Sequence, residues 1–322
     1  MTEPSLASTG SIAVPTRAAQ SGAGAGILIA LLSAAMFGLS GPFAKALMEA
    51  GWSPGAAVLV RVGGAALVML IPSILMLRGR WSLLFRKGRM LVAYGVIAIA
   101  GAQVSFFNAV QTLTVGVALL IEYLAPVLLV LAVWIIRRRR PGWLTIGGAV
   151  LAMIGMVLVL GIIGEVSISV PGVLWALTAA VCLAGYFVLS ARVDDELPPI
   201  ILASGGFVTG AVTIGLLGLV GLLPMRFSDQ PVTIVGWETH WIWPVLFLIL
   251  VPTVFAYISG IVAAGKLGSR IASFVGLTEV MFAVLASWLL LAELPTFIQL
   301  LGGLGIVAGV VLVRADRNQA SL

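Results

Sequence analysis

Two long stretches of this chain match one another without a gap, and they decide the fold. The first is "YLAPVLLVLAVWIIRRRRPGWLTIGGAVLAMIGMVLVL" (residues 123–160), and the second is "LTEVMFAVLASWLLLAELPTFIQLLGGLGIVAGVVLVR" (residues 277–314). The matched positions include Trp134 and Trp288, Pro141 and Pro295, Gly148 and Gly302, and Gly155 and Gly309. Self-similarity at a fixed separation indicates a duplicated structural unit.

The composition around this repeat is that of a membrane protein. Of the 322 residues, 61% are hydrophobic and 9% are charged, whereas soluble proteins carry about 25% charged residues. So few charges do not cover a water-facing surface. The net charge of +6 comes from bases in short loops between apolar runs, so we interpret these bases as topology signals and expect no nucleic-acid partner.

Apolar runs separated by polar breaks predict ten membrane-spanning helices, since a span needs about 20 apolar residues. The expected spans are 26–46, 55–77, 89–111, 114–136, 142–163, 171–191, 198–223, 241–263, 269–291 and 295–314. The prediction is therefore an all-α polytopic protein of the cell membrane.

The positions of the lysines and arginines predict that both termini are cytoplasmic. With ten spans in that orientation, fifteen bases fall on the cytoplasmic side, Lys45 and Arg226 fall outside, and Arg61 lies within a span. Cytoplasmic loops carry an excess of Lys and Arg. One missed helix would invert every loop that follows it, so this asymmetry supports both the count and the orientation.

The repeat predicts two halves inserted in opposite directions. The first half covers residues 25–163 and the second 171–314, with a disordered cytoplasmic tail at 1–24 and a short tail at 315–322. Five helices per half is an odd number, which makes the repeats inverted, and this is a recurring plan of secondary transporters. The alternative is a duplication without transport, as in a membrane enzyme or a scaffold.

Three ionisable residues lie well inside the predicted spans: Arg61, Glu122 and Glu279. A charge at the centre of a membrane helix costs about 2.5–3.5 kcal/mol on insertion scales, so such residues usually face a cavity and have a partner. Pro126 lacks the N–H group that would bond the carbonyl of Glu122. We therefore expect a broken helix there, which offers a carboxylate and a backbone carbonyl at one level to an ammonium group or a proton.

Each of these charges also has a structural interpretation. Glu122 can form an ion pair with Arg61 that only orients two helices, and Glu279 in "GLTE" can make a local polar contact. Arg61 is expected either to bind a carboxylate of the substrate or to neutralise Glu122. The sequence does not separate these roles.

Weaker candidates complete the predicted site. Gln103 and Asn108 are polar residues of the third span, where the alternative is a helix-packing hydrogen bond. Tyr123, with Tyr186 and Tyr257, is expected to line a cavity or to pack between helices. Gly305 and Gly309 form a GxxxG pair that favours close packing of the last helix, within the chain rather than in a dimer.

Catalytic and metal chemistry are not indicated. The sequence has one cysteine, Cys182, and one histidine, His240, and no cluster of potential metal ligands. No nucleophile–base pair is evident either. We therefore expect no cofactor, no metal and no enzymatic activity.

The ordered series of motifs resembles the drug/metabolite transporter superfamily, in its ten-helix branch built from two EamA-type repeats. The resemblance rests on "RVGGAALVML" (61–70), "NAVQTLTVGVALLIEYLAPVL" (108–128) and "AAGKLGSRIASFVGLTEVMFAVLASWLLLAELP" (263–295). It covers nearly everything after residue 25. The segment "LLIEYLAP" is most similar to exporters of amino acids such as threonine and homoserine, whereas Val280 and "IRRRRP" (136–141) depart from the family pattern.

The resemblance implies a secondary transporter that works by alternating access and exports a small polar metabolite, an amino acid being the best single guess. A cavity acid at which a proton and the substrate exclude each other gives exchange, so proton antiport is the expected coupling. The expected partners are the bilayer, the substrate and the proton, and the chain is expected to be a monomer or a homodimer. The alternatives are a multidrug or aromatic-compound exporter on the same fold, and an uptake carrier for a sugar or nucleotide-like metabolite.

Overall fold

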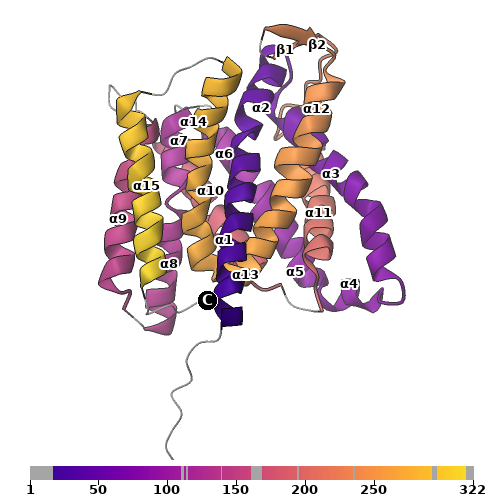
Figure 1. Ribbon diagram of the computed structural model, residues 1–322. Helices are drawn as coiled ribbons and strands as arrows, with labels where there is room; N and C mark the ends of the chain where they lie inside the picture. Colours follow the sequence, from indigo (N-terminus) through magenta and orange to yellow (C-terminus); the bar gives the residue numbers. More distant parts are fainter. Residues whose placement is uncertain are drawn as a thin grey trace, which may run out of the picture.

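A computed structural model shows a bundle of long helices with one short hairpin at one end (Figure 1). The described residues are 17–109, 112–113, 115–138, 140–160, 169–193, 196–234, 236–291 and 296–316. Most of the two predicted tails and the end of the predicted fifth span, at 161–163, lie outside these residues.

The first half of the bundle runs from α1 to α9. Its helices are α1 (Arg17–Gly38), α2 (Ser40–Glu49), α3 (Pro54–Leu77), α4 (Ser82–Arg86), α5 (Gly88–Ala93), the π-helical η1 (Tyr94–Gly101), α6 (Ala102–Ala109), α7 (Val115–Glu122), α8 (Ala125–Arg137) and α9 (Trp143–Leu160). Several of them continue one another, so α5, η1 and α6 form a single apolar helix from Gly88 to Ala109.

The second half runs from α10 to α15. Its elements are α10 (Val170–Ser190), α11 (Pro199–Leu219), β1 (Val232–Ile234), β2 (Trp237–Thr239), α12 (Ile242–Ile249), the π-helical η2 (Leu250–Phe255), α13 (Ala256–Gly276), α14 (Thr278–Leu291) and α15 (Phe297–Ala315). The strands β1 and β2 are antiparallel, with Thr233 opposite Glu238.

Nine helices of the described residues are long and apolar enough to cross a membrane. They coincide with the predicted spans to within a few residues, except where the eighth and ninth spans were expected. There, Ile242–Gly276 is one run of 35 residues, which at 1.5 Å per residue is about 50 Å, against a hydrocarbon core of about 30 Å.

That long run contains a sharp change of direction. Gly268 has φ 76° and ψ 160°, which is not helical, and glycine adopts such a positive φ at no steric cost. Figure 1 shows the orange ribbon descending through α12 to α13 at the bottom, and the golden ribbon rising again toward α14. The bend falls between the predicted eighth and ninth spans, while the count of ten and the orientation stay predictions.

Helices α9 and α15, which close the two repeats, pack tightly side by side (Figure 1). A Cβ atom on Gly148 would lie 2.6 Å from the carbonyl oxygen of Gly309, and one on Gly155 would lie 2.5 Å from that of Gly302. The pairs are crossed, so the two helices are antiparallel, as inverted repeats require. The close packing expected at Gly305 and Gly309 therefore occurs within the chain.

The outer surface of the bundle is apolar. Large hydrophobic side chains are exposed along most helices, such as Leu67 and Ile71 of α3 (72% and 68% exposed) and Leu304 of α15 (66%). Soluble monomers rarely expose apolar patches of this extent. This surface fits contact with lipid, and the buried polar residues lie between the helices instead.

Candidate functional site

Two broken helices form the frame of the site. The helix α7 ends at Glu122, a turn follows at Tyr123 and Leu124, and α8 begins at Ala125 with Pro126 in its first turn. Proline is accommodated there because the first N–H groups of a helix have no partner within it. The break lies where the sequence predicts it.

The second repeat breaks at the matching position. Leu277, which aligns with Tyr123 at the separation of 154 residues, is the turn between α13 and α14. The hydroxyl group of Thr278 donates to the carbonyl oxygen of Val275 at 2.7 Å across this turn. Glu279 follows as the second residue of α14. Irregular backbone at membrane depth is tolerated where it is buried in protein or lines a cavity.

The two breaks meet in the interior of the bundle. The hydroxyl group of Tyr123 hydrogen-bonds the carboxyl group of Glu279. Glu122 and Glu279 also interact electrostatically with each other. Each repeat thus contributes one acid, and both acids occupy the same small region although 157 positions separate them in the sequence.

Arg61 supplies the positive charge of this region. It lies on α3, is 8% exposed, and interacts electrostatically with Tyr257 and Glu279. Glu279 is thus one acid that interacts with Arg61, and both Glu122 and Glu279 interact with Tyr257 beside it. The Nε atom of Arg61 is buried and has no hydrogen-bond partner among the described residues, although a buried donor normally has one.

Aromatic rings surround Tyr257 beside these charges. Its ring lies 5.0 Å from that of Phe37, 5.2 Å from that of Phe207 and 5.6 Å from that of Tyr186, all edge-on. The side chain of Tyr257 also hydrogen-bonds Gln103 on α6. Gln103 is thus joined through Tyr257 to Arg61 and the two acids.

A second aromatic group lies beyond Tyr186. Tyr94, at the start of η1, and Tyr186 have ring centroids 6.1 Å apart. The hydroxyl groups of Tyr94 and Ser190 are 3.3 Å apart, and Tyr186 also hydrogen-bonds Ser190. These residues are buried, so the bundle is tightly closed on this side of the charged cluster.

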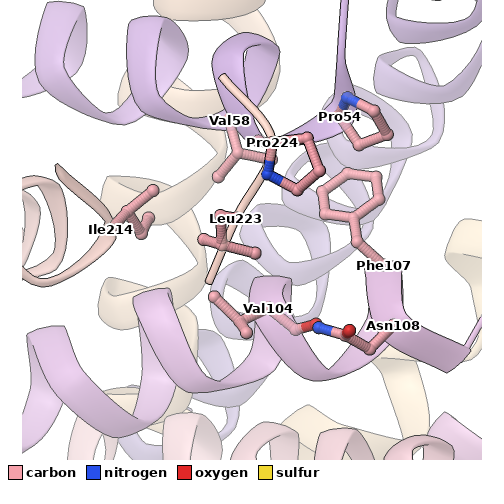
Figure 2. A pocket seen from close by; sticks show the side chains of 9 residues that line it. Pro54, Val58, Val104, Phe107, Asn108, Ile214, Leu223 and Pro224 are labelled. Carbon is pink, nitrogen blue, oxygen red and sulfur yellow. The ribbon is translucent and has the colours of Figure 1, made fainter. Parts of the chain in front are cut away.

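Asn108 does not join the cluster. Its amide nitrogen donates to the carbonyl oxygen of Val104 at 2.8 Å, and its side chain lines a separate small cavity beside Phe107 (Figure 2). Of the seven predicted site residues, five lie in or beside the charged cluster, namely Arg61, Gln103, Glu122, Tyr123 and Glu279. Pro126 is buried at the start of α8 and shapes the break.

A match to a family model decides what kind of protein has this architecture. The model of the EamA-like transporter family matches residues 24–161 and again residues 170–315. The chain belongs to the EamA-like transporter family. The resemblance drawn from the sequence motifs is thereby confirmed, as are the all-α membrane fold with two repeats and the location in the cell membrane. The family is one of transporters rather than of enzymes.

Curated relatives of this EamA-like transporter are also transporters. The chain is 25% identical to the uncharacterized inner membrane transporter YicL of Salmonella typhimurium, over 91% of this chain and 96% of that protein. It is 27% identical to the threonine/homoserine exporter RhtA of Escherichia coli, over 87% of this chain and 88% of that protein.

A third relative matches over a shorter length, and one solved structure supports the fold. The uncharacterized transporter YdfC of Bacillus subtilis is 26% identical over 65% of this chain, and the chain spans 65% of that protein, just under two thirds. A crystal structure has a TM-score of 0.67 and 23% identity, over 90% of this chain and 96% of that one. At that identity the likeness shows the fold alone.

Sequence reasoning missed one polar cluster of this EamA-like transporter. Arg270 is one of the fifteen bases that the sequence assigns to the cytoplasmic side, but it is 6% exposed and interacts electrostatically with Asp316. Asp316 follows α15 and accepts hydrogen bonds from the backbone nitrogen and the hydroxyl group of Thr145, at 3.1 and 2.6 Å. The cluster caps the first turn of α9 from the other repeat. A lone acid directly after the last span was the available signal.

Proposed function

We propose that this EamA-like transporter is a proton-coupled exporter of small polar metabolites, with amino acids as its substrate class. One observation carries the proposal. Arg61 has a buried nitrogen without a hydrogen-bond partner, and two carboxyl groups lie close by on the breaks of the two repeats. A zwitterionic amino acid has complementary groups, a carboxylate for Arg61 and an ammonium group for an acid.

In this proposal the two acids have different tasks. Glu279 already has partners, since it hydrogen-bonds Tyr123 and interacts with Arg61. Glu122 has Glu279 as its charged neighbour, and two carboxylates close together disfavour simultaneous ionisation. Glu122 is therefore the acid that binds either a proton or the ammonium group of the substrate. Exclusion of one by the other, with the two repeats rocking about the site, gives antiport.

The relatives support this assignment of substrate class. The exporters named RhtA are described as acting on threonine and homoserine, and both are amino acids with short side chains. The motif around Glu122 and Pro126 is the part of this chain that most resembles such exporters. Identity of 27% leaves the pocket side chains free to differ.

The test uses the Glu122→Gln variant, which keeps the shape of the side chain and removes its charge and its exchangeable proton. We expect the wild-type protein in proteoliposomes to move radiolabelled threonine when a proton gradient is imposed. The variant should lose this gradient-driven flux and should keep the thermal stability of the wild type.

The matched control is Glu238→Gln, which removes one carboxylate from the exposed strand β2 and should leave the flux unchanged. Undiminished proton-driven flux in Glu122→Gln contradicts the assigned coupling residue. Stabilisation of the wild type by lipophilic cations or sugars, with none by amino acids at two pH values, contradicts the substrate class.

A further inference from the structure

A small apolar cavity lies between helices that also carry residues of the charged cluster, and the proposed mechanism assigns it no role. Its volume is about 50 Å³. Figure 2 shows Val58, Val104, Phe107, Ile214 and Leu223 around the space, which helices α3, α6 and α11 and the segment after α11 enclose. The other lining residues are Pro54, Gly55, Asn108 and Pro224.

The cavity is one helical turn away from the residues proposed to bind the substrate. Val58 precedes Arg61 by three residues on α3, and Phe107 follows Gln103 by four residues on α6. Residues three or four apart lie on the same face of a helix. A molecule held by Arg61 on this face of α3 is therefore about one helical turn, roughly 5.4 Å along the axis, from the level of the cavity.

One side of the cavity is fixed by hydrogen bonds between the residue before α3 and the backbone of the segment after α11. The hydroxyl group of Ser53 donates to the carbonyl oxygen of Pro224 at 2.7 Å and accepts from the backbone nitrogen of Arg226 at 2.8 Å. A Cβ atom on Gly55 would lie 2.7 Å from the same carbonyl oxygen. The start of α3 and the segment after α11 thus touch directly, and the cavity does not widen there without breaking these contacts.

The size of the cavity sets a limit on its occupant. A cavity that binds a benzene ring has a volume of about 150 Å³, whereas this one has about 50 Å³. Side chains with three or four non-hydrogen atoms, such as those of threonine, valine and leucine, fit. The rings of phenylalanine and tryptophan do not.

We infer that this cavity is the side-chain subsite of the transported amino acid and that Phe107 sets its upper size limit. The inference rests on the proposed function. Eight of the nine lining residues carry no polar side chain and suit an aliphatic group, while the amide of Asn108 suits one hydroxyl group. The transporter therefore selects amino acids with short aliphatic or hydroxylated side chains.

The test measures a size profile in proteoliposomes, with competition by unlabelled alanine, threonine, leucine and phenylalanine against labelled threonine. Alanine, threonine and leucine should reduce the uptake of labelled threonine by the wild type, and phenylalanine should not. Phe107→Ala removes the ring, so phenylalanine should become a competitor, with its apparent affinity relative to threonine raised about tenfold or more.

The neighbouring residue provides a matched control. Phe106 does not line the cavity, because it packs against the cluster of Ala109, Leu113 and Ala118, and its ring centroid is 5.9 Å from that of Phe107. Phe106→Ala removes the same ring from the same helix and should leave the size profile unchanged. An equal change in both variants overturns the inference.

A second variant makes the cavity smaller instead of larger. It keeps the inference testable if Phe107→Ala folds poorly. Val104→Phe adds a ring at a half-buried position of the lining, and should retain competition by alanine while weakening that by leucine about tenfold. If Phe107→Ala and Val104→Phe both transport amino acids with the size profile of the wild type, the subsite is overturned but the proposed function is not. A wild type that exchanges no amino acid overturns the proposed function and, with it, this inference.

Discussion

At the scale of single residues, the charges inside the bundle come from a few buried or half-buried side chains. Arg61, Glu122 and Glu279 are each costly within a membrane, and the structure shows why they are tolerated together. Arg61 and Glu279 interact electrostatically, and Tyr123 hydrogen-bonds the acid. Removing one member of such a group leaves the other charge buried and uncompensated.

Arg61 gives the sharpest prediction at this scale. In Arg61→Gln, the proposed anchor of the substrate carboxylate is lost, and a hydrogen bond to a charged group contributes about 1.5–3 kcal/mol. We expect the apparent affinity for threonine to fall roughly 10- to 100-fold, while the affinity for threonine methyl ester changes little.

Competition assays in proteoliposomes measure both affinities. Arg226→Gln serves as the control, since it removes a base from an exposed position and should alter neither affinity. Equal losses for the acid and the ester would show that Arg61 has only a structural role.

At the scale of elements, the repeat in the sequence is visible in two structural features. These are the breaks in the helices and the contacts between glycines of α9 and α15. The breaks at Tyr123 and Leu277 occupy matching positions of the two repeats, and the glycines of one repeat touch those of the other. Because small residues let membrane helices approach closely, the antiparallel pair depends on them.

Adding a single methyl group should therefore have different effects at two nearby glycines of α9. A Cβ atom on Gly155 would lie 2.5 Å from the carbonyl oxygen of Gly302, whereas one on Gly147 meets nothing within 4 Å. Gly155→Ala should destabilise the protein by about 1–3 kcal/mol, the usual cost of overpacking.

Gly147→Ala should be neutral or slightly stabilising, because alanine has the higher helix propensity. Thermal unfolding of both variants in the same detergent measures the difference. Equal unfolding temperatures for the two variants would mean that the close contact between α9 and α15 does not contribute to stability.

At the scale of the whole molecule, topology follows from the bend at Gly268. Ten spans with cytoplasmic termini place Lys266 inside and both Asp229 and Thr296 outside. Cysteines introduced singly at these three exposed positions in a Cys182→Ser background report the side of the membrane.

An impermeant thiol reagent applied to intact cells should label Asp229→Cys and Thr296→Cys, and should leave Lys266→Cys unlabelled until the cells are permeabilised. Labelling of Lys266→Cys in intact cells would contradict the predicted orientation. Labelling that places positions 266 and 296 on the same side of the membrane would contradict the ten-span arrangement.

The sequence by itself determined the membrane class, the duplicated unit, the break at Glu122 and Pro126, and the family. The membrane class and the break follow from local quantities, namely hydropathy over about 20 residues and the absent N–H group of proline. The duplicated unit and the family follow from the order of residues along the chain, which needs no structure to be compared. It also identified the costly charges, because a charged residue within an apolar run is conspicuous wherever it points.

Only the tertiary structure decided which of these residues meet. The sequence leaves open whether Arg61 neutralises Glu122 or binds the substrate, and in the fold Arg61 interacts electrostatically with Glu279. On α6, Gln103 hydrogen-bonds Tyr257, whereas Asn108 lines the small cavity. The interaction of Arg270 on α13 with Asp316 after α15 likewise joins two elements that are distant in sequence. Such pairings depend on how helices distant in sequence rotate and pack against one another, and no local pattern encodes that geometry.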